Sequence, residues 1–170
     1  MAEKVFHFRI LLDQSDEVFR DILIRPDSSF QDLHDAIIKA FSFSGMEMAS
    51  FYLSNDEWDK GQEISLMDFG AEDTRVMSDI PLKELLSSEG DKLLYLYDFM
   101  RMWIFFVELI SLDEENSDII YPLVALSVGD APEETSKEPV DSFPTDFEDD
   151  IESEEEPGFE NIDDLEDDFI

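Results

Sequence analysis

The chain has 170 residues, of which 45 are acidic and 11 are basic, so its formal net charge is −34. A surface this acidic excludes nonspecific binding to nucleic acid or to an anionic membrane, and it favours a basic partner. Cysteine is absent, which excludes a disulfide framework and any thiolate chemistry.

The N-terminal stretch MAEKVFHFRILLDQ interrupts its apolar residues with Lys4, His7 and Arg9, so it lacks the continuous apolar run of a signal peptide. No window of the sequence reaches the roughly 18 consecutive apolar residues that a membrane-spanning helix needs. We therefore expect a cytoplasmic protein without membrane contact.

The chain opens with two predicted strands. Apolar residues alternate with polar ones over residues 5–12, with Phe6 and Phe8 on one face and His7 on the other, and they alternate again over residues 18–25. Five polar residues separate the two runs, which is typical of an antiparallel hairpin.

A helix is predicted next, over residues 28–41. Phe30, Leu33, Ile37 and Phe41 recur at steps of three and four residues, which places them on one face of a helix. Ser28 and Gln31 have the spacing of a capping box, and Gly45 is a stop signal.

Four more strands and a short helix follow. Residues 48–54 and 62–67 predict a second hairpin, and residues 78–90, with Pro81 near the start, predict the short helix. Residues 92–99 read as a strand with Tyr95, Tyr97 and Phe99 on one face. Residues 102–110 are apolar on both faces, so we expect a central strand covered on both sides.

A last strand is predicted over residues 119–129, where Pro122 favours a sheet edge. The whole order predicts an α+β domain over residues 1–130, with an antiparallel-rich sheet and the main helix on one face; a β-grasp-like sheet is the alternative. Residues 131–170 carry eighteen acidic residues and one lysine, which is half of the net charge. This composition predicts a disordered acidic tail.

Apolar residues punctuate the acidic tail, where charge repulsion would keep them accessible to a partner. Candidates for insertion into an apolar pocket of a basic protein are Phe159, Ile162, Leu165, Phe169 and Ile170. The alternative is a tail that only keeps the protein soluble.

Candidate catalytic residues are few. His34 is the first, because imidazole titrates near neutral pH and binds metals, although a structural histidine is the alternative. Asp98 is either a catalytic carboxylate or a turn residue that accepts backbone hydrogen bonds. Neither acidic run has the ligand spacing of a calcium loop, and a glycine-rich phosphate loop is absent. We expect no metal and no cofactor.

The stretches DSSFQDLHDAIIKAF, SFYL and YDFMRMWIFFVEL resemble the plasmid-Ri open-reading-frame-three-like family of bacteria and archaea, also called insertion-element passenger proteins, over about residues 5–130. The pair Leu33-His34 matches a Leu-His pair in that family's first helix. Further matches are Tyr97, Asp98, Phe99, Trp103, Glu108 and Leu109. The resemblance implies the same fold, in a family without an established biochemical activity.

Four positions depart from the family pattern. Met100 replaces the family's turn glycine, and Arg101 replaces the acidic residue that follows it. Phe105 and Glu47 each replace a histidine of the family pattern. The resemblance therefore implies that a site based on histidine and aspartate is mostly lost in this chain.

The sequence favours a non-enzymatic protein-interaction module whose acidic tail docks on a basic protein. Two alternatives stay open. One is an acidic mimic of nucleic acid that inhibits a DNA-binding protein. The other is a residual hydrolase or metal-dependent enzyme that uses His34, Asp98 and Glu47.

Overall fold

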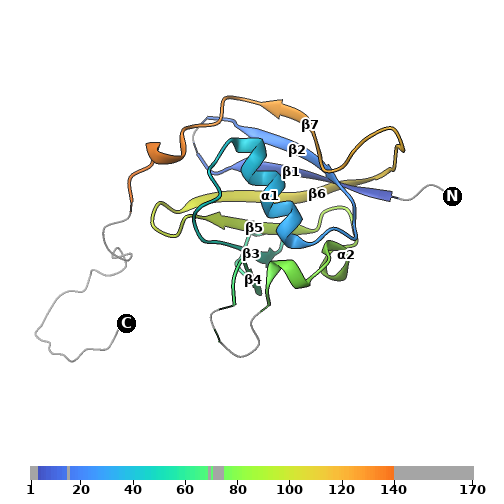
Figure 1. Cartoon of the computed structure of the whole chain (residues 1–170), viewed down its shortest axis with the longest axis horizontal. Coiled ribbons are helices and arrows are strands. Elements are labelled where there is room, and N and C mark those ends of the chain that lie inside the picture. The colour runs from blue at the N-terminus through green and yellow to red at the C-terminus, as the bar shows by residue number, and fades with distance from the viewer. Residues whose placement is uncertain (1–3, 15, 69, 71–74, 140–170) are drawn as a thin grey trace, which may run out of the picture. The chain divides into compact units, whose positions relative to one another are not determined.

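The computed structural model describes residues 4–14, 16–68, 70 and 75–139. Within these residues a seven-stranded sheet has the order β4-β3-β5-β6-β1-β2-β7 (Figure 1). The strands are β1 (Lys4–Leu12), β2 (Phe19–Ile24), β3 (Ala49–Ser54), β4 (Glu63–Ser65), β5 (Lys92–Tyr97), β6 (Trp103–Glu114) and β7 (Leu123–Val128). The helices are α1 (Phe30–Phe41) and α2 (Leu82–Leu85), with single 3-10 turns at η1 (Met77–Asp79) and η2 (Glu134–Ser136).

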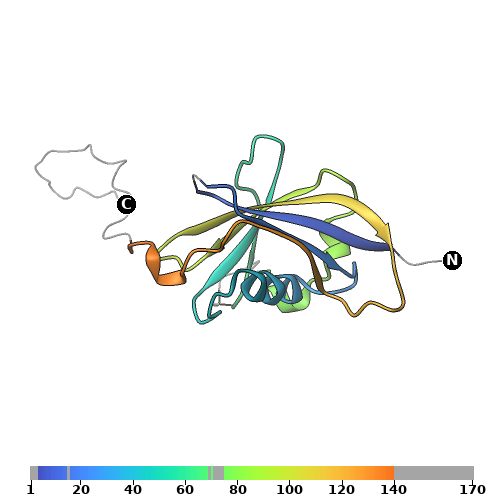
Figure 2. The ribbon, with the colours of Figure 1, turned by 90° about the horizontal axis from the view of Figure 1, so that it is seen from above.

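Every pairing between these named strands is antiparallel. Figure 2 shows α1 and α2 on the same side of the sheet. The prediction of an antiparallel-rich α+β fold is thereby confirmed. The β-grasp alternative is wrong, because β1 lies between β6 and β2 and runs antiparallel to both, whereas a β-grasp pairs its first strand in parallel with its last.

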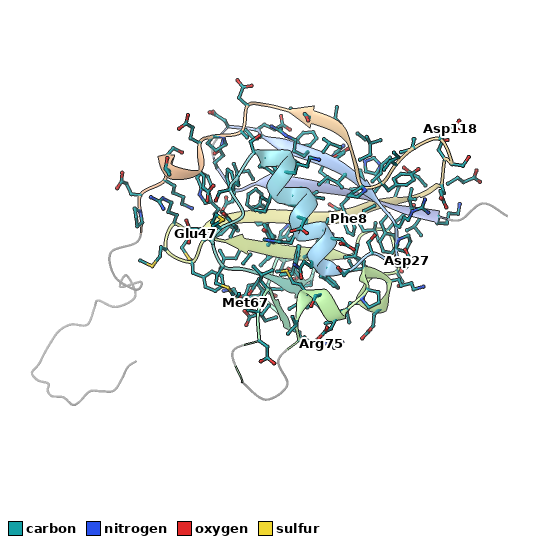
Figure 3. The ribbon with its side chains drawn as sticks, in the orientation of Figure 1. Phe8, Asp27, Glu47, Met67, Arg75 and Asp118 are labelled. Atoms are coloured by element: carbon teal, nitrogen blue, oxygen red, sulfur yellow. The ribbon has the colours of Figure 1, made fainter. Side chains whose placement is uncertain are left out.

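The hydrophobic core lies between α1 and the sheet. Alternation in β1 buries Phe6, Phe8, Ile10 and Leu12 on the helix side, as the period-two pattern predicted (Phe8 is labelled in Figure 3). The stripe of α1 that carries Phe30, Leu33, Ile37 and Phe41 packs against them, and all four of its side chains are buried.

The predicted caps of α1 are wrong by a few residues. Ser29, not Ser28, begins the helix: its side chain accepts from the Asp32 amide at 3.0 Å, and the Asp32 carboxylate accepts from the Ser29 amide at 2.9 Å. Ser28 is instead part of a turn, in which its amide donates to the carbonyl of Arg25. At the other end Ser42, with a φ of 61°, ends the helix before Gly45 is reached.

The strand β6 is central as predicted, but it is covered on one side only. Trp103, Phe105, Val107 and Leu109 are buried beneath α1, whereas the residues between them are only half-buried on the opposite face. Among the described residues, no second helix lies there. The prediction of cover on both sides is therefore wrong.

The strand β5 ends at Tyr97, earlier than predicted. Asp98 adopts a left-handed φ of 66°, which breaks the extended backbone. Phe99 consequently leaves the buried face that Tyr95 and Tyr97 share, and its side chain is exposed.

The compact unit that contains the sheet extends to Lys137. The seven residues after the predicted boundary at residue 130 thus belong with the sheet. Residues 140–170 lie outside the described residues, and with them Phe159, Ile162, Leu165, Phe169 and Ile170. The disordered tail and its docking residues stay predictions. In the described part of the chain, neither helix has the length and apolar character needed to cross a membrane.

Candidate functional site

The first candidate, His34, lies on the inner face of α1 and is buried. Its Nδ1 atom is 2.6 Å from the hydroxyl of Tyr95 on β5. Burial lowers the pKa of His34, with Asp35 opposing, and burial raises the pKa of Tyr95 well above its ordinary value. The Tyr95 hydroxyl therefore stays protonated and donates a hydrogen bond to the neutral imidazole of His34. These surroundings are those of a structural histidine.

Asp98 organises the turn between β5 and β6. Its Oδ1 accepts from the amides of Met100 and Arg101 at 3.0 and 3.1 Å, and its own amide donates to the carbonyl of Met48 at 2.8 Å. Its Oδ2 is buried without a hydrogen bond, and the nearest guanidinium nitrogen, of Arg101, is 3.6 Å away. This geometry is that of a turn carboxylate.

Glu47, the third candidate, is exposed on the loop between α1 and β3 (Figure 3). Among the described residues, no group of three His, Asp or Glu side chains is placed to hold a metal ion. His34, Asp98 and Glu47 therefore do not form a common metal site.

A short segment after β7 lies against the end of the sheet where β5 turns into β6. We call residues 133–137 the strap. The indole Nε1 of Trp103 donates to the carbonyl of Glu134 at 3.1 Å. Lys137 Nζ donates to the carbonyl of Met102 and lies 5.4 Å from the centre of the Trp103 ring. Both ends of the strap are thus fixed to the body.

The Glu134 carboxylate is held by three donors, which we call the carboxylate cradle. They are the Ser44 amide at 2.6 Å, the Ser44 hydroxyl at 3.0 Å and the Tyr97 hydroxyl at 2.8 Å. Burial alone would raise the pKa of Glu134, but the hydrogen bonds from Ser44 and Tyr97 have a larger combined effect, and the pKa is lowered overall. The carboxylate is therefore bound as an anion.

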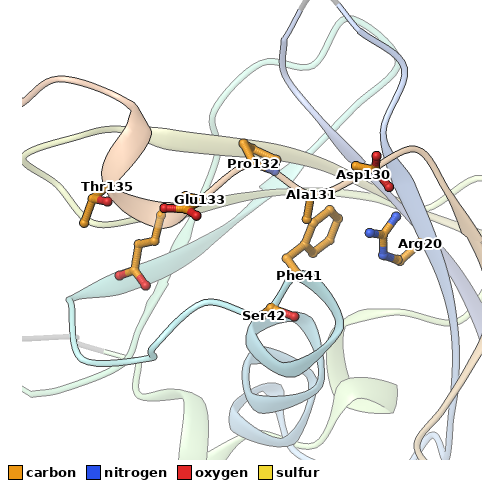
Figure 4. A pocket seen from close by; sticks show the side chains of 9 residues that line it. Arg20, Phe41, Ser42, Asp130, Ala131, Pro132, Glu133 and Thr135 are labelled. Atoms are coloured by element: carbon orange, nitrogen blue, oxygen red, sulfur yellow. The ribbon is translucent and has the colours of Figure 1, made fainter.

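Beside the strap is a hollow of about 550 Å³, lined by Arg20, Phe41, Ser42 and residues 130–135 (Figure 4). Arg20 extends into the protein and is 7% exposed. Its guanidinium donates to the carbonyls of Phe19, Ala40, Val128 and Gly129. Burial lowers its pKa, with Asp130 opposing. Arg20 thus joins the end of α1 to the end of β7.

The second feature of interest is β7, which pairs with β2 at the edge of the sheet. In the described part of the chain, no strand pairs with its other side. Its sequence, Leu-Val-Ala-Leu-Ser-Val, has no charged residue, and its first five residues are exposed. A groove of about 660 Å³ separates β7 from α1, and its lining includes Ile22, Ala36, Ala40, Pro122 and Val124.

Sequence reasoning missed the strap entirely, because Glu134 is one of eighteen acidic residues in the tail. Two signals were nevertheless present in the sequence. Lys137 is the only basic residue after residue 130, and Arg20 occupies an inward position between Val18 and Ile22 in an alternating strand. An arginine at such a position predicts buried hydrogen bonds.

Comparison with protein families matches residues 4–163 to the family described as plasmid pRiA4b ORF-3-like protein. Among solved structures, the crystal structure of a protein of unknown function, MM3350 from Methanosarcina mazei Go1, has a TM-score of 0.68 and 21% sequence identity. The alignment covers 81% of this chain and 77% of that one, and it shows the fold alone. A comparison with curated proteins finds no match.

The family match extends past the region of the resemblance, since it includes the strap and most of the acidic segment. It spans far more than half of the sequence. The chain belongs to the plasmid pRiA4b ORF-3-like family.

Proposed function

We propose that this chain is a non-enzymatic protein-interaction module that binds an extended segment of a basic protein along the open edge of β7. One observation carries the proposal: an uncharged edge strand in a chain of which 33% of residues are charged. Edge strands of soluble proteins are normally protected by charges, prolines or bulges, because an open apolar edge pairs with other chains. Pro122 precedes β7 and its register has one irregularity, but the strand itself has no charge. Strand addition is a common mode of peptide recognition.

The side chains of β7 extend this surface to both faces. Val124 lies opposite Ile22 and borders the groove beside α1. The register shifts between this pair and the next, so that Leu126 lies opposite Asp21 on the other face. The groove has room because α1 presents the small residue Ala36 there. A partner strand added to β7 would place alternate apolar side chains in this groove.

Lys39 lines the groove itself, and the acidic residues that would attract a basic segment lie in the hollow beside it. Asp32 and Asp35 line a smaller hollow of about 350 Å³, in which Ala36 and Pro122 continue the wall of the groove. Opposite charges across an interface increase the rate of association and exclude acidic competitors. The acidic tail would add to this attraction, with its five apolar docking residues as a second contact.

The proposal can be tested without knowing the partner. The full chain is used to select from a library of displayed random peptides. We expect the selected peptides to alternate apolar residues with Lys or Arg. Leu126→Lys should weaken the best peptide more than about tenfold, or about 1.4 kcal/mol, and Leu126→Glu should weaken it less because its charge suits a basic ligand. Met67→Lys, at another exposed apolar residue, is the control.

Two results would contradict the proposal. The first is a selected set of acidic peptides or of peptides with a helical spacing of apolar residues. The second is equal loss of binding in Leu126→Lys and Met67→Lys, which would show a response to charge alone. A chain ending at Lys137 tests the tail separately: weaker binding at low salt would support its part in docking.

A further inference from the structure

We infer that the carboxylate cradle and Trp103 form a peptide-binding site for segments with a glutamate followed three residues later by a lysine, and that the strap is its built-in occupant. This site is independent of the β7 edge. The described contacts between the strap and the body support the inference in three steps.

First, the cradle is organised by the body itself. The amide of Gly45 donates to the Tyr97 hydroxyl at 3.0 Å, and the amide of Met46 donates to the Ser44 hydroxyl at 3.1 Å. Each hydroxyl thereby accepts one hydrogen bond from a backbone amide and donates its own to the Glu134 carboxylate. Gly45 permits this loop because its φ is +76°.

Second, the two recognised side chains lie three positions apart and both face the body. Glu134 is the first residue of the 3-10 turn η2, and Lys137 follows its last residue with an extended backbone. The Glu134 carboxylate lies in the cradle, and the Lys137 ammonium lies over the ring of Trp103.

Third, the rest of the recognition uses the backbone. Trp103 Nε1 donates to the carbonyl of Glu134, and Arg101 Nε donates to the carbonyl of Lys137 at 2.9 Å. Backbone contacts of this kind do not depend on the ligand's side chains. Specificity therefore comes from the glutamate and the lysine.

An external segment must compete with the strap, which is held nearby at an effective concentration of the order of millimolar for a short tether. The expected competitor is a glutamate-x-x-lysine segment of another protein. A second copy of this chain is disfavoured, because two chains of net charge −34 repel each other.

The experiment weakens the built-in occupant in the full chain with Glu134→Gln and Lys137→Gln. The probe is a fluorescent peptide with the sequence of residues 131–139, APEETSKEP, followed by fluorescence polarisation. We expect the double variant to bind it at least about tenfold more tightly than the unmodified chain does, a difference of about 1.4 kcal/mol. Glu133→Gln, an adjacent change of the same charge, should bind as the unmodified chain does.

Specificity is checked from both sides of the contact. The peptide's second glutamate corresponds to Glu134, and replacing it by glutamine should abolish binding. Ser44→Ala in the double variant should weaken binding, because one donor of the cradle is lost. Ser44 is exposed, so this change does not disturb the core. Sodium acetate at matched concentration should not displace the peptide; displacement would show a site for a single carboxylate and overturn the inference.

Amide exchange over residues 131–137 of the double variant separates the negative outcomes. If the strap opens and the peptide still does not bind, the cradle is not a binding site in trans. If the strap stays closed, Glu134 and Lys137 are not what holds it. Each of these results overturns the inference. So would light scattering that shows a dimer in which two chains exchange their straps, if the peptide does not bind.

Discussion

The hydroxyl of Tyr95 lies 2.6 Å from Nδ1 of His34, although 61 positions separate the two residues in the sequence. One side chain comes from β5 and the other from α1, and both are buried. Burial opposes charge on each of them, so the contact is a hydrogen bond between two neutral groups. It couples the stability of the domain to pH.

His34 should make the domain less stable in mild acid. The pKa of folded His34 is lowered from the ordinary value of 6.5, so below pH 6.5 the unfolded chain binds a proton that the folded chain does not. Stability therefore falls with falling pH in this window and is fully present above it. His34→Gln should flatten the pH dependence of the free energy of unfolding, measured by urea titration. Parallel curves for the two proteins would contradict this explanation.

The same pair predicts a non-additive response to mutation. Tyr95→Phe leaves a buried histidine nitrogen without its donor, which costs on the order of 1–3 kcal/mol. His34→Leu leaves the Tyr95 hydroxyl unpaired at a similar cost. The double variant should lose clearly less than the sum of the two, because both polar groups are gone. Urea unfolding of the four proteins measures this coupling, and strict additivity would show that the hydrogen bond contributes nothing.

The strap predicts that the position of a truncation matters. A chain ending at Asp130 leaves the indole of Trp103 and the hydroxyl of Tyr97 without their strap partners, so we expect a loss on the order of 1–3 kcal/mol in the free energy of unfolding. A chain ending at Lys137 keeps these contacts and should stay within about 0.5 kcal/mol of the full chain. Equal stability of the two truncated chains would show that the strap contributes nothing to folding.

Much of the fold could be predicted because each element carries a local pattern. The alternation of β1 and the apolar stripe of α1 depend only on neighbours within a few residues, and both were confirmed. The cap of α1 was misplaced because Ser28 and Ser29 both precede a suitable polar residue by three positions. Only the turn formed by residues 25–28 decides between them.

The candidate sites depend on contacts that no local pattern encodes. Glu134 meets Ser44 across 90 positions and Tyr97 across 37, so a composition argument assigns it to solvent. The open face of β6 was misread for a related reason. Apolar residues on both sides of a strand usually indicate two covering layers, but Phe106 is only half-buried, with the ring of Trp58 packing on it from a loop.

Asp98 gives a last test, which separates a turn residue from a residue whose charge is needed. Asp98→Asn keeps an acceptor for the amides of Met100 and Arg101, and asparagine tolerates the left-handed φ of 66°. It also removes a charge whose Oδ2 is buried without a hydrogen bond. We expect its free energy of unfolding to stay within about 1 kcal/mol of the unmodified chain.

Asp98→Ala lacks both the acceptor and the tolerance of a positive φ, and we expect it to cost about 2–3 kcal/mol. Urea unfolding of the two variants measures the difference. Arg101→Gln is the matched control: it removes the guanidinium that lies 3.6 Å from Oδ2, together with its hydrogen bond to the Lys137 carbonyl. If Asp98→Asn is as unstable as Asp98→Ala, the negative charge itself is required, and its attraction to Arg101 would then outweigh the hydrogen bonds that Oδ1 accepts in the turn.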